Sequence, residues 1–424
     1  MSNDVLDVLV VGGGPAGACM GALLARGCGD DPKGMRVAVL EPRRPRRVDS
    51  HDPIDTRVVA ISRASERIMG AAGAWDRVVG PRICAYQRMR VWHETSTPEG
   101  AGALLFDAAE AGEPNLGYIV ESRLVQAALL DALAEAGGRI ETGELRSLDI
   151  GADCVTAQTS AGPLSARLVV GADGAQSAVR QAVGLTADSS DYRQTAIVAN
   201  VKTEKSHEST AWQRFMRDGT LAFLPLSDAA SSIVWSADDA VASRLIAASP
   251  AEFAVELNRA SDRALGSTRL VSDRSSFPLR RLAAHGYVAN RCALIGDAAH
   301  VVHPLAGQGV NLGLLDAAAL AQTLFDARRE KEDVGAQRVL RKYARWRKSE
   351  VAVIATAIDA FDRLLSHGSG PVSRLAQHGL AWVNRSQEIK RLFIARALGI
   401  SGELPHAAQR RAGTPAKTTL FAGR

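Results

Sequence analysis

The sequence predicts an α/β protein in which a Rossmann-like nucleotide-binding domain carries an inserted antiparallel β-sheet domain and is followed by C-terminal helices. Three observations lead to this fold class. Residues 5–26 combine a short apolar run, a glycine-rich turn and an Ala/Leu-rich run, which indicate a strand, a tight turn and a helix. Residues 190–280 alternate apolar and polar side chains over short runs, as antiparallel strands do. Residues 296–313 form a second glycine-rich turn between an apolar strand end and another Ala/Leu-rich helix.

The composition is that of an ordinary globular protein. The 424 residues are 46% hydrophobic and 23% charged, and they suffice for two or three domains. The net charge of +5 is too diffuse to indicate a nucleic-acid partner, but it suits anionic ligands or an acidic membrane surface. The five cysteines are scattered without metal-ligand spacing, so we expect free thiols in a reducing compartment.

The N-terminal apolar run does not have the pattern of a signal peptide. Asp4 and Asp7 lie where a signal peptide requires positive charge. No uninterrupted apolar stretch is long enough to span a bilayer. We therefore expect a cytoplasmic protein, and peripheral contact with the inner face of a membrane stays open.

The first turn carries the pattern Gly12-x-Gly14-x-x-Gly17, with Pro15 and Ala16 between the last two glycines. In such a turn the first glycine permits a tight bend and the second lets a pyrophosphate approach the backbone, while the third lets helix and strand pack closely. The phosphates would lie against the positive end of the helix that follows. The pattern favours FAD over NAD, because this unit opens the chain and no second copy of it appears.

The next apolar strand ends in Glu41, whose carboxylate can accept hydrogen bonds from the ribose hydroxyls of an adenosine. The run PRRPRR follows over residues 42–47. Two interpretations of this run stay open. It is either a solvated basic loop or a surface that attracts the phosphates of NADPH or anionic lipid headgroups.

Three further residues are candidates for cofactor contacts. Arg57 precedes a predicted apolar-periodic helix, and a guanidinium fixed there could hold a phosphate or the edge of a flavin. Arg123 starts a predicted helix and is a second candidate for a phosphate contact. For both arginines a structural ion pair is the competing explanation. Asp173, in the turn GADG after another apolar strand, can accept from a ribose or brace the phosphate-binding loop.

These segments together resemble a known family. The Gly12 motif, the GADG turn and "GDAAHVVHPLAGQGVNLG" resemble the flavoprotein aromatic hydroxylases related to p-hydroxybenzoate hydroxylase. The segments "TRVVAIS", "LGYIVES", "AWQRF", "LAFLPL" and above all "HPLAGQGVNLG" are similar to one branch, the ubiquinone-biosynthesis hydroxylases of polyprenylated phenols. The resemblance spans nearly the whole chain. One departure is Ser122, where the family commonly has Asn after the Glu.

The resemblance implies a role for the second glycine-rich turn. Asp297 would contact the ribityl chain or a neighbouring phosphate, and residues 307–311 would wrap the flavin ring with main-chain N–H groups. The following helix would aim its positive end at the N1–O2 side of the ring, where negative charge develops on reduction. The residues of this turn that we expect at the cofactor are Gly296, Asp297, Pro304, Gly307, Gly309, Val310 and Asn311.

The resemblance also implies an activity. NADPH or NADH would reduce the bound FAD, and O2 would add to it as a C4a-hydroperoxide. A polyprenylated phenol of ubiquinone biosynthesis would then be hydroxylated. No acid–base side chain is strictly required, so we assign no catalytic residue. His300 and His303 have no third ligand nearby, so we expect no metal site.

Two alternative functions stay open. The first is an enzyme of the same fold that hydroxylates a small aromatic without a prenyl tail. The second is a non-catalytic scaffold subunit of a quinone-synthesis complex. Assembly with such a complex, or with a second copy of this chain, also stays open.

The predicted domain organisation is discontinuous. The FAD-binding domain is expected over residues 1–75, 112–185 and 285–365. The β-rich substrate-binding domain is expected over residues 76–111 and 186–284, and its aromatic residues are candidates for the pocket wall. A helical region over residues 366–405 would pack on the body or face a membrane or partner. Residues 406–424 are expected to be disordered.

Overall fold

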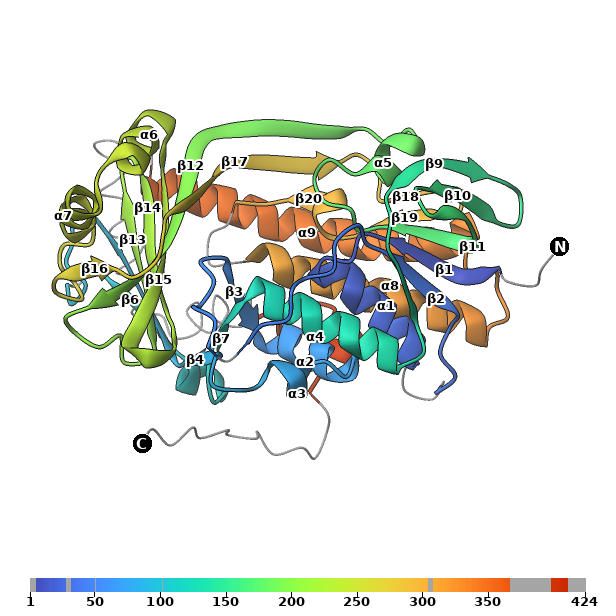
Figure 1. Cartoon of the computed structure of the whole chain (residues 1–424), viewed down its shortest axis with the longest axis horizontal. Coiled ribbons are helices and arrows are strands. Elements are labelled where there is room, and N and C mark those ends of the chain that lie inside the picture. The colour runs from blue at the N-terminus through green and yellow to red at the C-terminus, as the bar shows by residue number, and fades with distance from the viewer. Residues whose placement is uncertain are drawn as a thin grey trace.

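Three β-sheets and the helices packed on them make up the described part of the molecule (Figure 1). The computed structural model describes residues 5–27, 32–49, 51–100, 102–303, 308–366 and 398–410. The first sheet is mostly parallel and the second is mostly antiparallel, which confirms the predicted α/β fold class.

The first sheet has a parallel centre with strand order β19-β11-β1-β2-β8. These strands are β1 (Leu6–Val11), β2 (Val37–Leu40), β8 (Arg139–Glu141), β11 (Gly162–Gly171) and β19 (Cys292–Leu294). Antiparallel strands extend it, namely β9 (Leu145–Ile150), β10 (Val155–Thr159) and β18 (Val288–Ala289). All four residues of β2 are buried, as expected for a parallel sheet covered on both faces.

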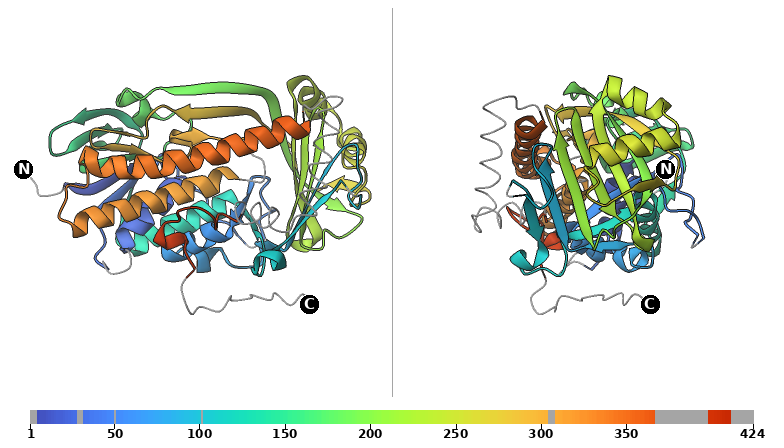
Figure 2. Two further views of the ribbon diagram at one scale, coloured as in Figure 1. Left: turned by 180° about the vertical axis from the view of Figure 1, so that it is seen from behind. Right: turned by 90° about the vertical axis from the view of Figure 1, so that its left-hand side faces the viewer.

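Helices from distant parts of the chain pack on this sheet or on one another. They are α1 (Pro15–Arg26), α2 (Arg63–Ala71), α3 (Trp75–Val78), α4 (Ser122–Glu135), α5 (Ala178–Ala182), α8 (Gln308–Arg329) and α9 (Gln337–Ser366). The long helices α8 and α9 lie side by side, as Figure 2 shows from behind. Helix α1 packs between α4 and α8, and Pro15 opens it at the position where a missing N–H costs nothing. The main hydrophobic core lies between these helices and the sheet.

The second sheet has the order β20-β17-β12-β15-β14-β13-β5-β6, with β16 also paired to β12. Its strands are β5 (Arg88–His93), β6 (Leu104–Asp107), β12 (Ala187–Thr203), β13 (Thr210–Met216), β14 (Gly219–Pro225), β15 (Ala230–Asp238), β16 (Thr268–Leu270), β17 (Ser275–Ala284) and β20 (His300–Val301). The helices α6 (Asp239–Ala247) and α7 (Pro250–Ala260) lie across its outer face (Figure 2, right). The alternation over residues 190–280 therefore predicted antiparallel strands correctly.

The third sheet corrects one expectation. It pairs β3 (Val58–Ser62) with β7 (Gly117–Glu121), and β7 with β4 (Cys84–Tyr86). Arg57 therefore precedes a strand, and the predicted helix, α2, begins only at Arg63. The β-branched residues Val58, Val59 and Ile61 favour the strand. Ser62 ends it and caps α2, because its hydroxyl accepts a hydrogen bond from Ser65 N at 3.3 Å.

Parts of the predicted C-terminal region lie outside the described residues. These are residues 367–397 of the predicted helical region and residues 411–424 of the predicted disordered tail. The start of that tail is ordered, because His406–Ala408 form a short helical turn with Ala408 buried, so the prediction of disorder is wrong there. Within the described ranges, no helix combines the length and the apolar character that crossing a bilayer requires.

Candidate functional site

A cavity of about 800 Å³ opens at the carboxyl ends of the parallel strands β1, β11 and β19. Ligands in α/β folds bind at this edge, and the volume is within the range of about 300–1,000 Å³ typical of cofactor sites. We call it the first cavity. The predicted cofactor residues that line it are Gly12, Gly14, Pro15, Ala16, Glu41, Asp173, Gly296, Asp297, Gly309 and Val310.

The Gly12 turn has the close packing that its sequence predicts. Gly12 has a φ of +100°, and a Cβ there would lie 2.4 Å from the carbonyl oxygen of Ala172. A Cβ on Gly17 would lie 1.9 Å from the carbonyl oxygen of Gly12, so strand and helix are in backbone contact. Gly14 differs, because a Cβ there would project into space with nothing within 4 Å. A side chain at Gly14 would fill a place in the cavity that the backbone leaves clear.

Two carboxylates brace the turns at the rim of the first cavity. Glu41 accepts a hydrogen bond from Gly13 N at 2.6 Å. Asp173 accepts from the Ser177 hydroxyl at 2.5 Å and from Val179 N at 3.1 Å. Each carboxylate therefore fixes its turn while lining the cavity.

The first turn of α8 reaches both the first cavity and β3. Its opening N–H groups have no partner inside the helix and carry the positive end of the helix dipole. Gly309 and Val310 line the cavity. The Asn311 side chain accepts from Ser62 N at 2.9 Å and donates to the Ala60 carbonyl at 2.8 Å, which fixes the start of α8 on β3. Pro304 and Gly307 lie outside the described residues.

Three segments meet at backbone distance beside this turn. Gly296 follows β19, Gly313 lies in α8, and Ala16 lies in α1. A Cβ on Gly296 would lie 3.2 Å from the Ala16 Cβ, and one on Gly313 would lie 3.0 Å from it. The residues at this crossing are small because the three backbones approach so closely.

A buried ionic network holds the second glycine-rich turn. The Asp316 carboxylate accepts from His300 Nε2 at 2.6 Å, from Arg347 Nε at 2.7 Å and from Gly296 N at 3.0 Å. Burial opposes the ionisation of Asp316, but His300 and Arg347 outweigh it and lower the pKa of Asp316 to about 2. Asp316 and Arg347 were not among the residues predicted from the sequence. The available signal was an acidic residue inside the Ala/Leu-rich helix.

A second cavity of about 440 Å³ lies between the third sheet and the inner face of the second sheet. It shares Pro15, Asp297 and Val310 with the first cavity, so the two cavities meet there. The Asp297 side chain is exposed to them. The protein atoms around this carboxyl still displace much of its water and raise the pKa of Asp297 above its ordinary value. His300 acts to lower this pKa, and Asp316 acts to raise it.

The wall of the second cavity is mainly apolar. Apolar lining residues include Val58, Val59, Ala60, Ile119, Val198, Ala222, Leu224 and Val234. Polar lining residues include Ser122, Gln213, Thr220, Ser236 and His303. A mainly apolar wall with a few polar groups is typical of a site for a small organic molecule.

The aromatic residues expected at the pocket differ in whether they line the second cavity or lie in the core. Trp212 lines the second cavity, but its ring packs against Trp92 with ring centroids 6.1 Å apart. Phe223 and Trp235 are buried in the core beneath α6 and α7, and Phe215 is buried in a smaller core.

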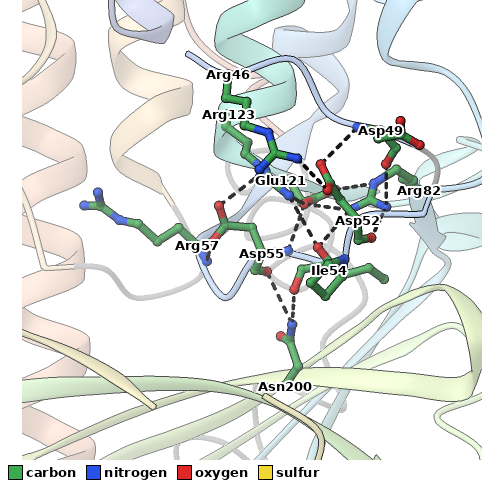
Figure 3. Close-up of polar contacts among 11 residues, drawn as sticks. Arg46, Asp49, Asp52, Ile54, Asp55, Arg57, Arg82, Glu121, Arg123 and Asn200 are labelled. Carbon is green, nitrogen blue, oxygen red and sulfur yellow. Dashed lines mark hydrogen bonds and ion pairs between the residues drawn. The ribbon is translucent and has the colours of Figure 1, made fainter. Parts of the chain in front are cut away.

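The two candidate arginines have different surroundings (Figure 3). Arg57 lines the second cavity, is exposed and points away from the neighbouring charges. Arg123 lines neither cavity. Its guanidinium lies 3.1 Å from Glu121 Oε1 and 3.5 Å from Asp55 Oδ2, so the ion pair considered for it is present.

Glu121 is the centre of this group, which we call the Glu121 cluster (Glu121, Arg82, Arg123 and Asp55). The wholly buried Glu121 carboxylate receives both Arg82 Nε at 2.7 Å and Arg82 Nη2 at 2.9 Å. Asp55 N donates to it at 2.8 Å. Burial opposes its ionisation, but the bonds from Arg82, Asp55 N–H and Arg123 outweigh this effect and lower the pKa of Glu121. The cluster thus anchors the loop that leads to Arg57.

Comparisons with known proteins agree with this geometry. A family model described as "FAD binding domain" matches residues 5–356. The chain is 36% identical to the ubiquinone hydroxylase UbiL of Rhodospirillum rubrum, over 94% of this chain and 90% of that protein. It is 34% identical to the 3-demethoxyubiquinol 3-hydroxylase of Escherichia coli, over 94% of this chain and 100% of that protein. The crystal structure of p-nitrophenol 4-monooxygenase PnpA from Pseudomonas putida is 21% identical with a TM-score of 0.74, covering 94% of this chain and 99% of that one.

Proposed function

The chain belongs to the FAD-dependent hydroxylases of ubiquinone biosynthesis, and we propose that it hydroxylates the aromatic ring of a polyprenylated phenol, using NADPH or NADH and O2. The protein is a flavoprotein monooxygenase, as its relatives and the match to the FAD-binding family indicate. The observation that carries the substrate proposal is the junction of the two cavities. Pro15, Asp297 and Val310 border both, so a cofactor in the first cavity can meet a substrate in the second.

We assign the FAD to the first cavity. The pyrophosphate fits the clear space at Gly14, against the positive end of α1. The adenosine ribose would lie near Glu41 at the end of β2, and the ring near Gly309 and Val310 at the start of α8. When bound, the flavin takes electrons from the nicotinamide and activates O2 for transfer to the aromatic ring. A phosphate contact for Arg123 stays a prediction, since its guanidinium is paired with Glu121 and Asp55.

The protein's own contribution is to position the ring and exclude water. The mainly apolar second cavity can hold a ring and the first part of a prenyl tail and can keep bulk water away from them. No side chain in it is required to transfer a proton. We propose that the substrate-binding unit comprises residues 76–111 and 186–284, since β5 and β6 join β12–β17 in one sheet.

Oxidation of NADPH by the FAD-loaded protein tests the proposal, with and without a short-chain 2-prenylphenol. We expect faster oxidation and a product one oxygen atom heavier by mass spectrometry. A matched reaction with NADH identifies the preferred donor. Bound FAD without any response to prenylphenols would contradict the proposal and favour a substrate without a tail.

We further infer contact with the inner face of a membrane, because a polyprenyl tail partitions into lipid. Exposed cations on helix α9 support this contact, because they are spaced three and four residues apart along one side of the helix. They are Arg338, Arg341, Lys342, Arg345 and Lys348. Co-sedimentation with anionic vesicles tests the contact. Equal sedimentation with neutral vesicles would contradict a role for these cations. Assembly with other enzymes or a second copy stays a prediction.

A further inference from the structure

Gln213 on β13 is a polar residue buried in the wall of the second cavity. Its exposed fraction is 5%, and it lines the cavity. Within the described part of the chain, no group forms a hydrogen bond with its side-chain amide. A buried amide without a partner costs free energy, so such a group in a cavity wall indicates a ligand that supplies the missing bonds.

The strand geometry directs this amide into the cavity. The side chains of its neighbours in sequence pack on the opposite side of the sheet. Trp212, which also borders the cavity, packs against the core beneath α6 and α7, and Arg214 Nη1 donates to the Ala260 carbonyl at 2.7 Å. Successive side chains on a strand point to opposite faces. The Gln213 side chain therefore lies on the cavity face of β13.

Apolar residues surround Gln213 on this face. Ala222 on β14 is its direct cross-strand partner, followed by Val234 on β15 and Val198 on β12. All three line the cavity. The amide is the one polar side chain among these four paired positions, so it fixes where a polar atom of the ligand can lie.

Two hydroxyls lie one step further along the same face. Thr220 and Ser236 are cross-strand partners, line the cavity, and are 6% and 2% exposed. Diagonal positions on a sheet are about 7–8 Å apart, which is close to the span of a substituted aromatic ring. The lining residues that come from the second sheet include no charged side chain. This wall therefore suits a neutral ring with oxygen substituents, while Arg57 borders the cavity from the side of the third sheet.

We propose that Gln213 determines substrate specificity by hydrogen-bonding a phenolic hydroxyl of the ring, with Thr220 and Ser236 beside a second ring oxygen. The amide carbonyl accepts from the hydroxyl, and the amide N–H donates to an oxygen next to it. This inference rests on the proposed function, and it deepens that function by selecting rings with a free hydroxyl over rings without one.

Binding to the FAD-loaded protein without reductant tests the inference, measured by the change in flavin absorption. The ligands are a short-chain 2-prenylphenol and its O-methyl ether, which lacks the hydroxyl proton. In the wild type we expect the phenol to bind about 10-fold more tightly, the usual effect of one hydrogen bond. In Gln213→Met, which keeps the side-chain length, we expect this preference to vanish while the affinity for the ether stays the same.

Met216→Leu is the matched control, because Met216 lies on the same strand with its side chain on the opposite face. It should keep the preference for the phenol. A second readout is the amount of product per NADPH oxidised, which should fall in Gln213→Met because a ring held in the wrong orientation is not hydroxylated. If Gln213→Met does not fold, Gln213→Asn, which keeps the amide but withdraws it by one carbon, should reduce the same preference.

The outcomes separate the two proposals. If the wild type binds the phenol and Gln213→Met keeps the full preference, the role of Gln213 is wrong and the proposed function stands. If the wild type responds to neither compound, the proposed function is wrong, and this inference is overturned with it.

Discussion

His300 Nε2 lies 2.6 Å from Asp316 Oδ2, and the two side chains are 4% and 0% exposed. The same carboxylate accepts from Arg347 of α9 and from the backbone of Gly296. One buried anion therefore joins the end of β19 to α8 and α9. The position of the second glycine-rich turn depends on it.

Removing this anion should destabilise the protein. In Asp316→Asn the buried Arg347 guanidinium loses its counter-charge, and we expect a loss of about 3–5 kcal/mol in the free energy of unfolding. The FAD content after purification should fall as well. Urea unfolding and flavin absorbance per protein measure the two effects. The control is Asp326→Asn on the same helix, whose exposed pair with Arg329 is worth less than about 1 kcal/mol.

The same residue predicts a pH dependence of stability. The pKa of Asp316 is lowered from its ordinary value of 3.8 to about 2 in the folded protein. Its contribution to stability is complete above the unfolded pKa and is lost as the pH falls through the folded pKa. The difference corresponds to about 2 kcal/mol. The difference in unfolding free energy between the wild type and Asp316→Asn should therefore shrink by about 2 kcal/mol between about pH 4 and pH 2. Parallel curves for the two proteins would contradict this.

Two glycines of the first turn should separate cofactor binding from folding. Gly14→Val adds a side chain in open space, so we expect the apoprotein to keep its stability within about 0.5 kcal/mol and lose FAD affinity at least about 10-fold. Gly17→Ala places a Cβ 1.9 Å from a carbonyl oxygen and should destabilise the apoprotein by about 1–3 kcal/mol. Thermal unfolding of the apoproteins and a fluorescence titration with FAD measure these effects. Equal FAD affinities for Gly14→Val and the wild type would contradict the placement of the FAD pyrophosphate at Gly14.

The Glu121 cluster should control the loop beside the second cavity. Arg82 binds Glu121 with two hydrogen bonds and also donates to the carbonyls of Asp52 and Pro53. Arg82→Met leaves a buried carboxylate with fewer partners, and we expect a loss of about 3 kcal/mol. The KM for the phenol should rise, because Thr56 and Arg57 line the cavity.

Arg77→Met is the control for this experiment. Arg77 forms an ion pair with Glu135, and their side chains are 35% and 63% exposed. Its removal should change the free energy of unfolding by less than about 1 kcal/mol. If the two variants lose the same stability, the buried carboxylate does not have the role described.

The local patterns predicted much of the fold. The glycine turn at residues 12–17, the strand that ends in Glu41 and the strands of residues 190–280 depend on neighbours in sequence, so their signals are readable from the chain. Strand β3 was missed because its apolar residues run directly into α2 without a glycine or proline between them. Short apolar runs fit a strand and a helix equally well when no boundary is visible.

The contacts that shape the site could not be predicted in the same way. Asn311 and Ser62 are 249 residues apart, and Asn200 and Ile54 are 146 apart. Such pairs follow from the packing of whole elements and not from local periodicity. Arg123 is a further example. Its place at the start of a helix can be predicted from the sequence, but its ion pair with Asp55 forms only when the chain folds. Gln213 likewise stands out only when the surrounding cavity wall is known.

The crossing of Ala16, Gly296 and Gly313 has a consequence for how this gene can vary. Any single-base change in a glycine codon that alters the residue adds at least a Cβ. At Gly296 and Gly313 that atom would lie 3.2 and 3.0 Å from the Ala16 Cβ, so the packing of these segments must give way by a few tenths of an ångström. In a randomly mutagenised library, active clones should therefore carry few changes at these positions, although their side chains take no part in any chemistry. Here a limit on sequence drift falls where the molecule has almost no side chain to lose.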